Sequence, residues 1–198
     1  MAPQPLLSIA DPTPSTQHRA QIRAELLSIQ PWDALEQAQL AQMQDWVDSG
    51  APLCRIAKPA TPPRHLVSYF ALVDGEHILL VDHRNARLWL PSGGHVEPLE
   101  PPRRTVAREL AEELGLVVDE SEVGAPRFLT CITTVGLTAG HEDVSLWYVL
   151  PGDRHAPLPR FDAGEFESVR WFAFDEVPLQ RSDPHMGRFL DKLRDGAC

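Results

Sequence analysis

One 23-residue segment constrains this chain more than any other. It runs from Gly94 to Leu116 and reads GHVEPLEPPRRTVARELAEELGL. The two prolines after Glu100 suit the first turn of a helix, because proline lacks the N–H that this turn leaves unpaired and its φ is already helical. Gly115 can adopt the left-handed conformation that ends a helix. We therefore predict a helix that begins just after Glu100 and ends at Gly115.

The predicted helix has one apolar side and one acidic side. The apolar positions recur at helical spacing and are Val106, Ala107, Leu110, Ala111 and Leu114. Glu109, Glu112 and Glu113 share the other side, where positions three and four apart are neighbours and like charges repel. A cation should offset this repulsion. Mg²⁺ or Mn²⁺ fits best, because hard cations take oxygen ligands, neutralise a diphosphate and lower the pKa of an attacking water.

Arg108 lies beside this acidic side, eight residues after Glu100. We interpret Arg108 as a partner that orients a catalytic carboxylate through paired hydrogen bonds. Gly93 and Gly94 would let the backbone approach the site closely. The alternative is that the three glutamates form the solvated face of an ordinary surface helix.

The segment resembles the Nudix box at every fixed position: Gly94, five residues, Glu100, seven residues, then the run from Arg108 to Leu116. Average residue usage makes a chance match on the order of one in ten million for such a chain. The resemblance implies an α/β fold, the Nudix-like α/β/α sandwich with a mixed β-sheet, here with an N-terminal helical extension. It implies as metal ligands Gly94, through a carbonyl of the glycine pair, with Glu109, Glu112 and Glu113. It implies as catalytic residues Glu112, Glu109, Arg108 and Glu165.

Glu165 enters this set because of its place before a strand. It lies with Glu167 in AGEFESVRWF, where members of the Nudix family often have a further metal ligand or the general base. Glu142 and Asp143 precede another strand and are alternatives. A base must lie within hydrogen-bond reach of the attacking water, so geometry decides among these acids. We favour Glu165, and solvated loop acids are the competing interpretation.

Substrate contacts are predicted from a further set of residues. The candidates are Arg87, His95, Glu100 and Asp143. Arginine suits phosphate, and His95 could contact phosphate or act as an acid, although an incidental polar histidine explains it equally well. A base could stack on one of the aromatic residues Phe70, Trp147, Tyr148 and Trp171, each of which strand alternation could equally place in the core.

The composition limits which kinds of molecule the protein is expected to bind and where it is expected to act. The formal net charge of −10 argues against a nucleic acid polymer but is compatible with a small phosphorylated nucleotide-type substrate. No apolar run approaches 18 residues, so no membrane span is expected. The three cysteines have no metal-ligand spacing and the N-terminus does not resemble a signal peptide, which together favour reduced thiols and a cytoplasmic location.

The chain divides at a step rich in proline. Residues 1–50 are predicted to be a helical extension, with a helical pair between Thr16 and Ser49 separated by Pro31. This pair could cap the core, shape the pocket or form a homodimer contact. Residues 51–198 are predicted to be the Nudix hydrolase domain. Its expected strands are 65–74, 77–84, 87–94, 127–136, 143–150 and 168–174, and its last helix is expected at 183–193.

Three functions compete. The first is a metal-dependent pyrophosphohydrolase that cleaves a nucleoside diphosphate linked to another moiety, such as a nucleoside triphosphate, ADP-ribose or a nucleotide sugar. The second is a Nudix-type module that binds a nucleotide metabolite without cleaving it. The third is an isomerase of the isopentenyl diphosphate type, which would need a cysteine and a glutamate facing the substrate, and no cysteine adjoins the box. The sequence leaves the substrate itself open.

Overall fold

The computed structural model describes residues 14–58, 61–134 and 140–196. Its helices are α1 (Pro14–Ser28), α2 (Ala34–Asp48), α3 (Pro102–Leu114) and α4 (Met186–Arg194). Its strands are β1 (Arg64–Asp74), β2 (His77–His83), β3 (Leu88–Leu90), β4 (Ser92–His95), β5 (Phe128–Thr133), β6 (Glu142–Pro151) and β7 (Phe166–Ala173). Short 3₁₀ turns lie at Glu120–Glu122, Phe174–Glu176 and Leu179–Arg181.

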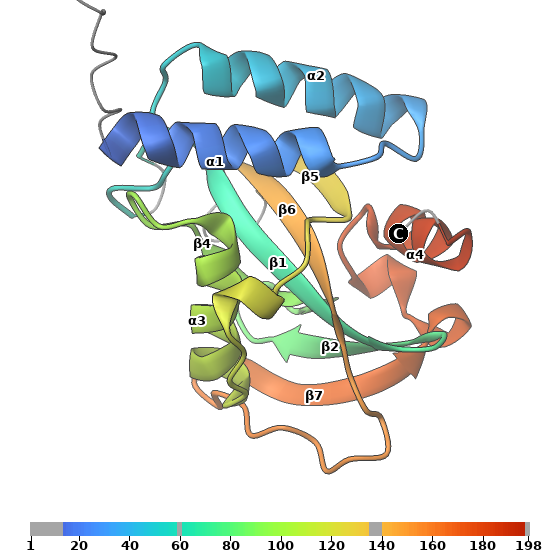
Figure 1. The fold of residues 1–198 in the computed structure, drawn as a ribbon. Coiled ribbons are helices and arrows are strands. Elements are labelled where there is room, and N and C mark those ends of the chain that lie inside the picture. The colour runs from blue at the N-terminus through green and yellow to red at the C-terminus, as the bar shows by residue number, and fades with distance from the viewer. Residues whose placement is uncertain (1–13, 59–60, 135–139, 197–198) are drawn as a thin grey trace, which may run out of the picture.

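The strands form one mixed sheet in the order β3-β2-β1-β6-β5, with β4 also paired to β1 and β7 to β2. β1 and β6 are parallel, and the other pairs are antiparallel. Because successive side chains in a strand point to opposite faces, β6 contributes to two cores. Leu146 and Tyr148 join the core that includes α1, α2 and α3, whereas Trp147 joins the core that includes Phe189 of α4. The predicted mixed sheet between helices is confirmed (Figure 1).

The segment predicted as one strand at 87–94 forms two strands instead. β3 pairs with β2, and β4 pairs with β1, so the chain changes partner at Pro91. Proline has no N–H to continue a hydrogen-bonded ladder, which explains the break. The change of partner places Gly93 and Gly94 beside β1, opposite Tyr69 and Ser68.

Several other predicted boundaries also differ; the strand predicted at 168–174, for example, is Phe166–Ala173. The last helix begins at Met186 rather than at Asp183, whose carboxylate accepts a hydrogen bond from the His185 N–H (2.7 Å) in the preceding turn. The strand predicted to end at residue 136 is described to Thr133, and its predicted last two residues lie outside the described residues. Cys198 also lies outside them, and the described Cys54 and Cys131 are free thiols.

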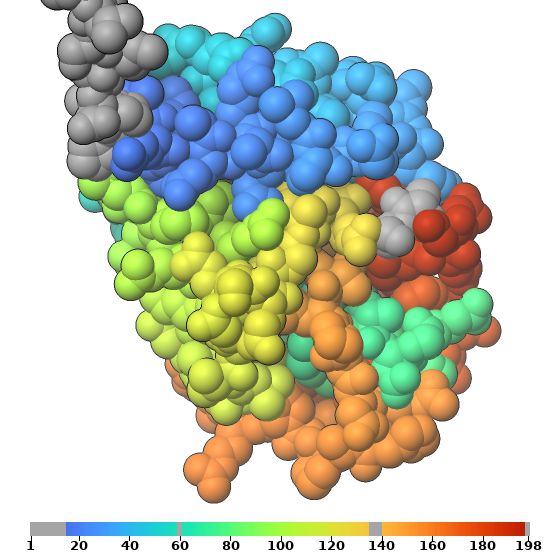
Figure 2. All heavy atoms as spheres, viewed as in Figure 1, coloured from blue at the N-terminus to red at the C-terminus, as the bar shows by residue number. Residues whose placement is uncertain are grey.

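The N-terminal helical pair shares its core with the sheet. Ile22, Leu26 and Met43 are fully buried in the same apolar cluster as the residues of α3 and β6. Figure 2 shows the two N-terminal helices packed directly against the rest of the molecule. The domain boundary at residue 50 stays a prediction, and so does the homodimer. In the described part of the chain, no helix is both long and apolar enough to cross a membrane.

Polar contacts fix the pair at both ends. Glu36 of α2 and Lys192 of α4 are fully buried and form an ion pair, with Nζ 2.9 Å from Oε1. The Glu36 carboxylate also accepts hydrogen bonds from the N–H groups of Trp32 (2.8 Å) and Leu129 (3.2 Å). At the other end, His18 Nε2 donates to the Glu100 carbonyl at 2.7 Å. The helical pair therefore contacts the segment that leads into α3.

Candidate active site

Helix α3 forms as its sequence predicts. It begins at Pro102, and Gly115 ends it with a φ of 62°, in the left-handed region. Val106, Leu110 and Leu114 are buried beneath it. The acidic side therefore faces away from the apolar core, next to β4.

Arg108 connects the acidic residues. Its guanidinium makes a paired contact with Glu100, with Nε 3.0 Å from Oε1 and Nη2 3.1 Å from Oε2. Nη1 donates to Glu109 Oε1 at 2.6 Å and to Glu112 Oε2 at 3.2 Å. Burial alone would raise the pKa of Glu100, but the hydrogen bonds from Arg108 and Thr105 outweigh it and lower that pKa. Arg108 thus holds Glu100 as an anion and orients two carboxylates of α3.

The two glycines of β4 make room for this arrangement. A Cβ built on Gly94 would overlap the Glu109 carboxylate. Gly93 has a φ of 150°, and a side chain there would collide with the Ser68 carbonyl of β1. Glu113 accepts hydrogen bonds from the Ser92 hydroxyl and from the Gly93 N–H (3.1 Å). Only glycine can therefore bring β4 this close to the helix and to β1.

Burial and neighbouring carboxylates raise the pKa values of two glutamates of α3. Burial, followed by the charges of Glu109 and Glu165, raises the pKa of Glu113 to about 8, although the Ser92 hydrogen bond opposes the rise. Burial also raises the pKa of Glu109, against the opposing effect of Arg108. Closely spaced carboxylates are the donor set that Mg²⁺ and Mn²⁺ prefer. Glu109, Glu113 and the Gly94 backbone therefore fit a divalent cation.

A cavity of about 350 Å³ opens beside these residues. Its lining includes Gly94, Arg108, Glu109 and Glu113 together with residues 55–58. Arg55 and Lys58 bring positive charge to it, and they were not among the predicted site residues because no motif or regular spacing marks them in the sequence. None of the described residues that line it is a cysteine, so the contact required by the isomerase hypothesis is missing there.

Glu165 lies near the carboxylates of α3. Its charge contributes to the raised pKa values of both Glu109 and Glu113, and its side chain is 44% exposed, with Oε1 3.6 Å from His83 Nε2. Glu112 is 60% exposed and reaches the site through Arg108. These positions are compatible with the predicted roles of Glu165 and Glu112, which stay predictions.

The predicted substrate residues are not all in one place. Glu100 is held by Arg108, and His95 lines the cavity. Arg87 lies in the turn between β2 and β3 and lines a second hollow of about 240 Å³. Asp143 faces a group of histidines described below. Their contacts with substrate stay predictions.

The aromatic residues considered for stacking belong to the cores. Phe70, Trp147 and Tyr148 are at most 2% exposed, and Trp171 packs against the same core as Tyr148. Arg103 of α3 is paired with Glu25 (Nε to Oε1, 2.6 Å). Phosphate recognition by the described residues would therefore depend on the cations that line the cavity.

A second polar cluster adjoins the end of β4. His65, His95, His141 and Asp143 each offer one atom, and the four atoms lie within 4.8 Å of one another. Burial, followed by the charge of Arg55, lowers the pKa of His95 to about 3. His65 was not a predicted site residue, because in the sequence it is simply the first residue of an apolar strand.

The family model of the NUDIX domain matches residues 63–193. The chain therefore belongs to the Nudix family. A solved MutT NUDIX hydrolase from Burkholderia pseudomallei is 26% identical, with a TM-score of 0.52, and the match covers 66% of this chain and 98% of that one. A UDP-X diphosphatase structure is 13% identical with a TM-score of 0.51, and the match covers 93% of this chain and 95% of that one.

A bifunctional NMN adenylyltransferase/ADP ribose pyrophosphatase from Francisella tularensis, solved with AMP and a manganese ion, is 18% identical. Its TM-score is 0.50, and the match covers 83% of this chain and 48% of that one. No curated protein sequence matches this chain. Family and fold together define a hydrolase of the Nudix type.

Proposed function

We propose that this protein is a divalent-metal-dependent pyrophosphohydrolase that cleaves a nucleoside diphosphate linked to another moiety. The observation that carries the proposal is the arrangement in which Arg108 contacts Glu100, Glu109 and Glu112 beside the cavity that Glu113 and Gly94 line. Two similar structures support the substrate class, because they are named for UDP-X and for ADP-ribose. Cytoplasmic activity is part of the same proposal.

We assign metal binding and the orientation of the carboxylates to residues of α3 and β4. Glu109, Glu112, Glu113 and the Gly94 carbonyl would hold Mg²⁺ or Mn²⁺, which supplies charge neutralisation for the diphosphate and a lowered pKa for the attacking water. Arg108 fixes the orientation of the carboxylates, so that little reorganisation is needed when the substrate binds.

Proton transfer and binding fall to other groups. Glu165 is the proposed general base, because its carboxylate is half exposed and lies near Glu109 and Glu113. Arg55 and Lys58 line the same cavity and would contact the phosphoryl oxygens, where cations offset the developing negative charge.

A substrate panel tests the proposal. Nucleoside triphosphates, ADP-ribose, dinucleotides and nucleotide sugars are incubated with Mg²⁺ and with Mn²⁺, and the products are separated by chromatography. We expect a nucleoside monophosphate from at least one substrate, and turnover reduced by about a thousandfold in Glu112→Gln. Glu176→Gln is the matched control, because Glu176 is exposed in a distant 3₁₀ turn.

Two outcomes would contradict the proposal. Full activity of a folded Glu112→Gln variant would remove the role of the α3 carboxylates. Thermal stabilisation by ADP-ribose without any product under either metal would instead favour the non-catalytic binding module.

A further inference from the structure

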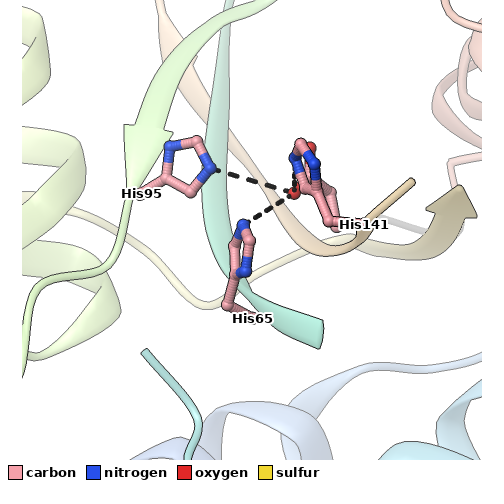
Figure 3. A group of neighbouring side chains, drawn as sticks. His65, His95 and His141 are labelled. Carbon is pink, nitrogen blue, oxygen red and sulfur yellow. Dashed lines mark ion pairs between the residues drawn. The ribbon is translucent and has the colours of Figure 1, made fainter. Parts of the chain in front are cut away.

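The histidine cluster, defined as His65, His95, His141 and Asp143, brings together residues from separate segments. His65 lies in β1, His95 ends β4, His141 directly precedes β6, and Asp143 is in β6. Figure 3 shows the three labelled rings pointing toward one carboxylate oxygen, which the ion pairs identify as Asp143 Oδ1. The distances from this oxygen to Nε2 are 3.2 Å for His65, 3.4 Å for His141 and 3.8 Å for His95.

The polar atoms at the centre of the cluster lack hydrogen-bond partners. His65 Nε2, His95 Nε2 and Asp143 Oδ1 are all buried without one. His65 itself is fully buried and His141 is 4% exposed. Leaving buried polar atoms unpaired is costly, so such a group in a native protein calls for an explanation, such as an ion.

The outer nitrogen of His65 fixes its tautomer. Its Nδ1 lies 2.8 Å from the Pro62 carbonyl, which can only accept a hydrogen bond, so Nδ1 carries the proton. This leaves Nε2 as the nitrogen that faces Asp143 Oδ1, 3.2 Å away. A cation between these two atoms would take one ligand atom from each residue, and a backbone carbonyl on the outer nitrogen is the usual support of a metal-bound histidine.

The spacing of the four atoms suits a small transition-metal ion. With bonds of about 2.0–2.2 Å, tetrahedral donors around Zn²⁺ lie about 3.3 Å apart. Two of the three distances to Asp143 Oδ1 are within 0.1 Å of this value, and the His95 distance is larger. Three imidazoles favour zinc and its neighbours over Mg²⁺, which takes oxygen ligands.

We propose that the histidine cluster binds one Zn²⁺-type ion, separate from the divalent cation of the α3 carboxylates. Four protein donors close the coordination, as in structural zinc sites. The ion would tie the start of β1, the end of β4 and the start of β6 together. It would thereby fix β4, whose residues Gly93 and Gly94 line the cavity.

Cobalt titration tests the proposal independently of any hydrolase activity. The purified protein is freed of metal with a chelator and titrated with Co²⁺ in millimolar Mg²⁺, which occupies oxygen sites. We expect one equivalent of Co²⁺ to bind with the intense visible absorption of tetrahedral coordination and to be displaced by Zn²⁺. One equivalent of Zn²⁺ should also raise the thermal midpoint by about 5 °C or more.

Matched variants locate the site. His65→Gln and His141→Gln should abolish the cobalt absorption. His155→Gln, at an exposed histidine, and Glu112→Gln, at the carboxylates, should retain it. Folding of each variant is checked by circular dichroism.

Two results would overturn the proposal. One is a folded wild-type protein that binds neither Co²⁺ nor Zn²⁺ stoichiometrically, a result that needs no variant. The other is a tetrahedral signal that persists in folded His65→Gln and His141→Gln proteins, because the ion would then lie elsewhere. Neither result depends on whether the protein hydrolyses a nucleotide.

Discussion

The carboxylate site of α3 and the histidine cluster meet at β4 but are built in opposite ways. The carboxylates come from one 23-residue segment, and Arg108 already supplies part of the opposite charge. The histidine cluster is collected from positions 65 to 143, and its central atoms have no hydrogen-bond partner. The first site depends on helix periodicity, whereas the second depends on the register of the sheet, in which His65 is paired with Asp143 and Val67 with His95.

The largest effect should come from a change outside both sites, in the buried ion pair between α2 and α4. Glu36→Ala leaves the ammonium of Lys192 buried without its carboxylate partner. We expect the free energy of unfolding to fall by about 3–5 kcal/mol, as when one member of a buried ion pair is removed. Urea denaturation measures this loss.

The control for this change removes both charges of the Glu36–Lys192 ion pair. The double variant Glu36→Gln with Lys192→Met should lose less stability than Glu36→Ala, because no buried charge is left alone. A loss below about 1 kcal/mol in Glu36→Ala would show that the buried pair does not hold the N-terminal helices in place.

The second-largest effect should change the carboxylate site and leave the histidine cluster unchanged. Arg108→Ala removes the contacts to Glu100, Glu109 and Glu112. We expect kcat/KM to fall by about 10- to 100-fold, the usual effect of losing a residue that orients metal ligands. Cobalt binding at the histidine cluster should not change.

Arg104→Ala is the matched control, because Arg104 is an exposed arginine on the same helix. An equal loss of activity in both variants would indicate a general effect of helix charge. Weakened cobalt binding in Arg108→Ala would contradict the independence of the two sites.

The same contrast explains what the sequence could predict. The box helix, its proline start and its Gly115 end follow from local rules and are confirmed. Helix geometry makes Arg108 and Glu112, four residues apart, neighbours, and their side chains are in contact. The prediction of one strand at 87–94 was wrong, because the change of partner at Pro91 depends on the pairing of β4 with β1, which is not visible in the local sequence.

The remainder depended on contacts between distant segments. His65 reads as part of an apolar strand, and only the pairing of β1 with β6 brings it to Asp143. Arg55 and Lys58 lie in a segment without regular spacing, so only the folded chain shows that they line the cavity. A motif search finds residues that act through one helix, and it misses those that a sheet assembles.

Asp183 is a buried carboxyl that belongs to neither site, so it can be compared with the buried Glu113 of α3. Burial raises the pKa of Asp183 to about 6, with an opposing hydrogen bond from the His185 N–H. The folded-state pKa lies above the unfolded value, so Asp183 costs little stability below about pH 4; the cost grows between about pH 4 and pH 6 and is constant at higher pH. Asp183→Asn should therefore stabilise the protein by about 2 kcal/mol at pH 7.5 and hardly at all at pH 4.

Mg²⁺ distinguishes this carboxyl from Glu113, whose pKa is also raised by burial. The gain from Asp183→Asn should be the same with and without Mg²⁺, because the described contacts of Asp183 include no second carboxylate. Wild-type stability at pH 7.5 should itself rise with Mg²⁺. Denaturation curves at both pH values measure these effects, and a stabilisation at pH 4 equal to that at pH 7.5 would refute the electrostatic explanation.

The smallest effect concerns Arg55, which lies between the two sites. It lines the cavity, and its charge also contributes to the lowered pKa of His95. If Arg55 contacts a substrate phosphate, Arg55→Gln should raise KM by about three- to tenfold, or ~0.6–1.4 kcal/mol, with little change in kcat. The increase should shrink at high salt, since ions screen the lost attraction. If KM is unchanged and cobalt binds more tightly instead, Arg55 acts on the histidine cluster alone, and the phosphate contact must be assigned to Lys58.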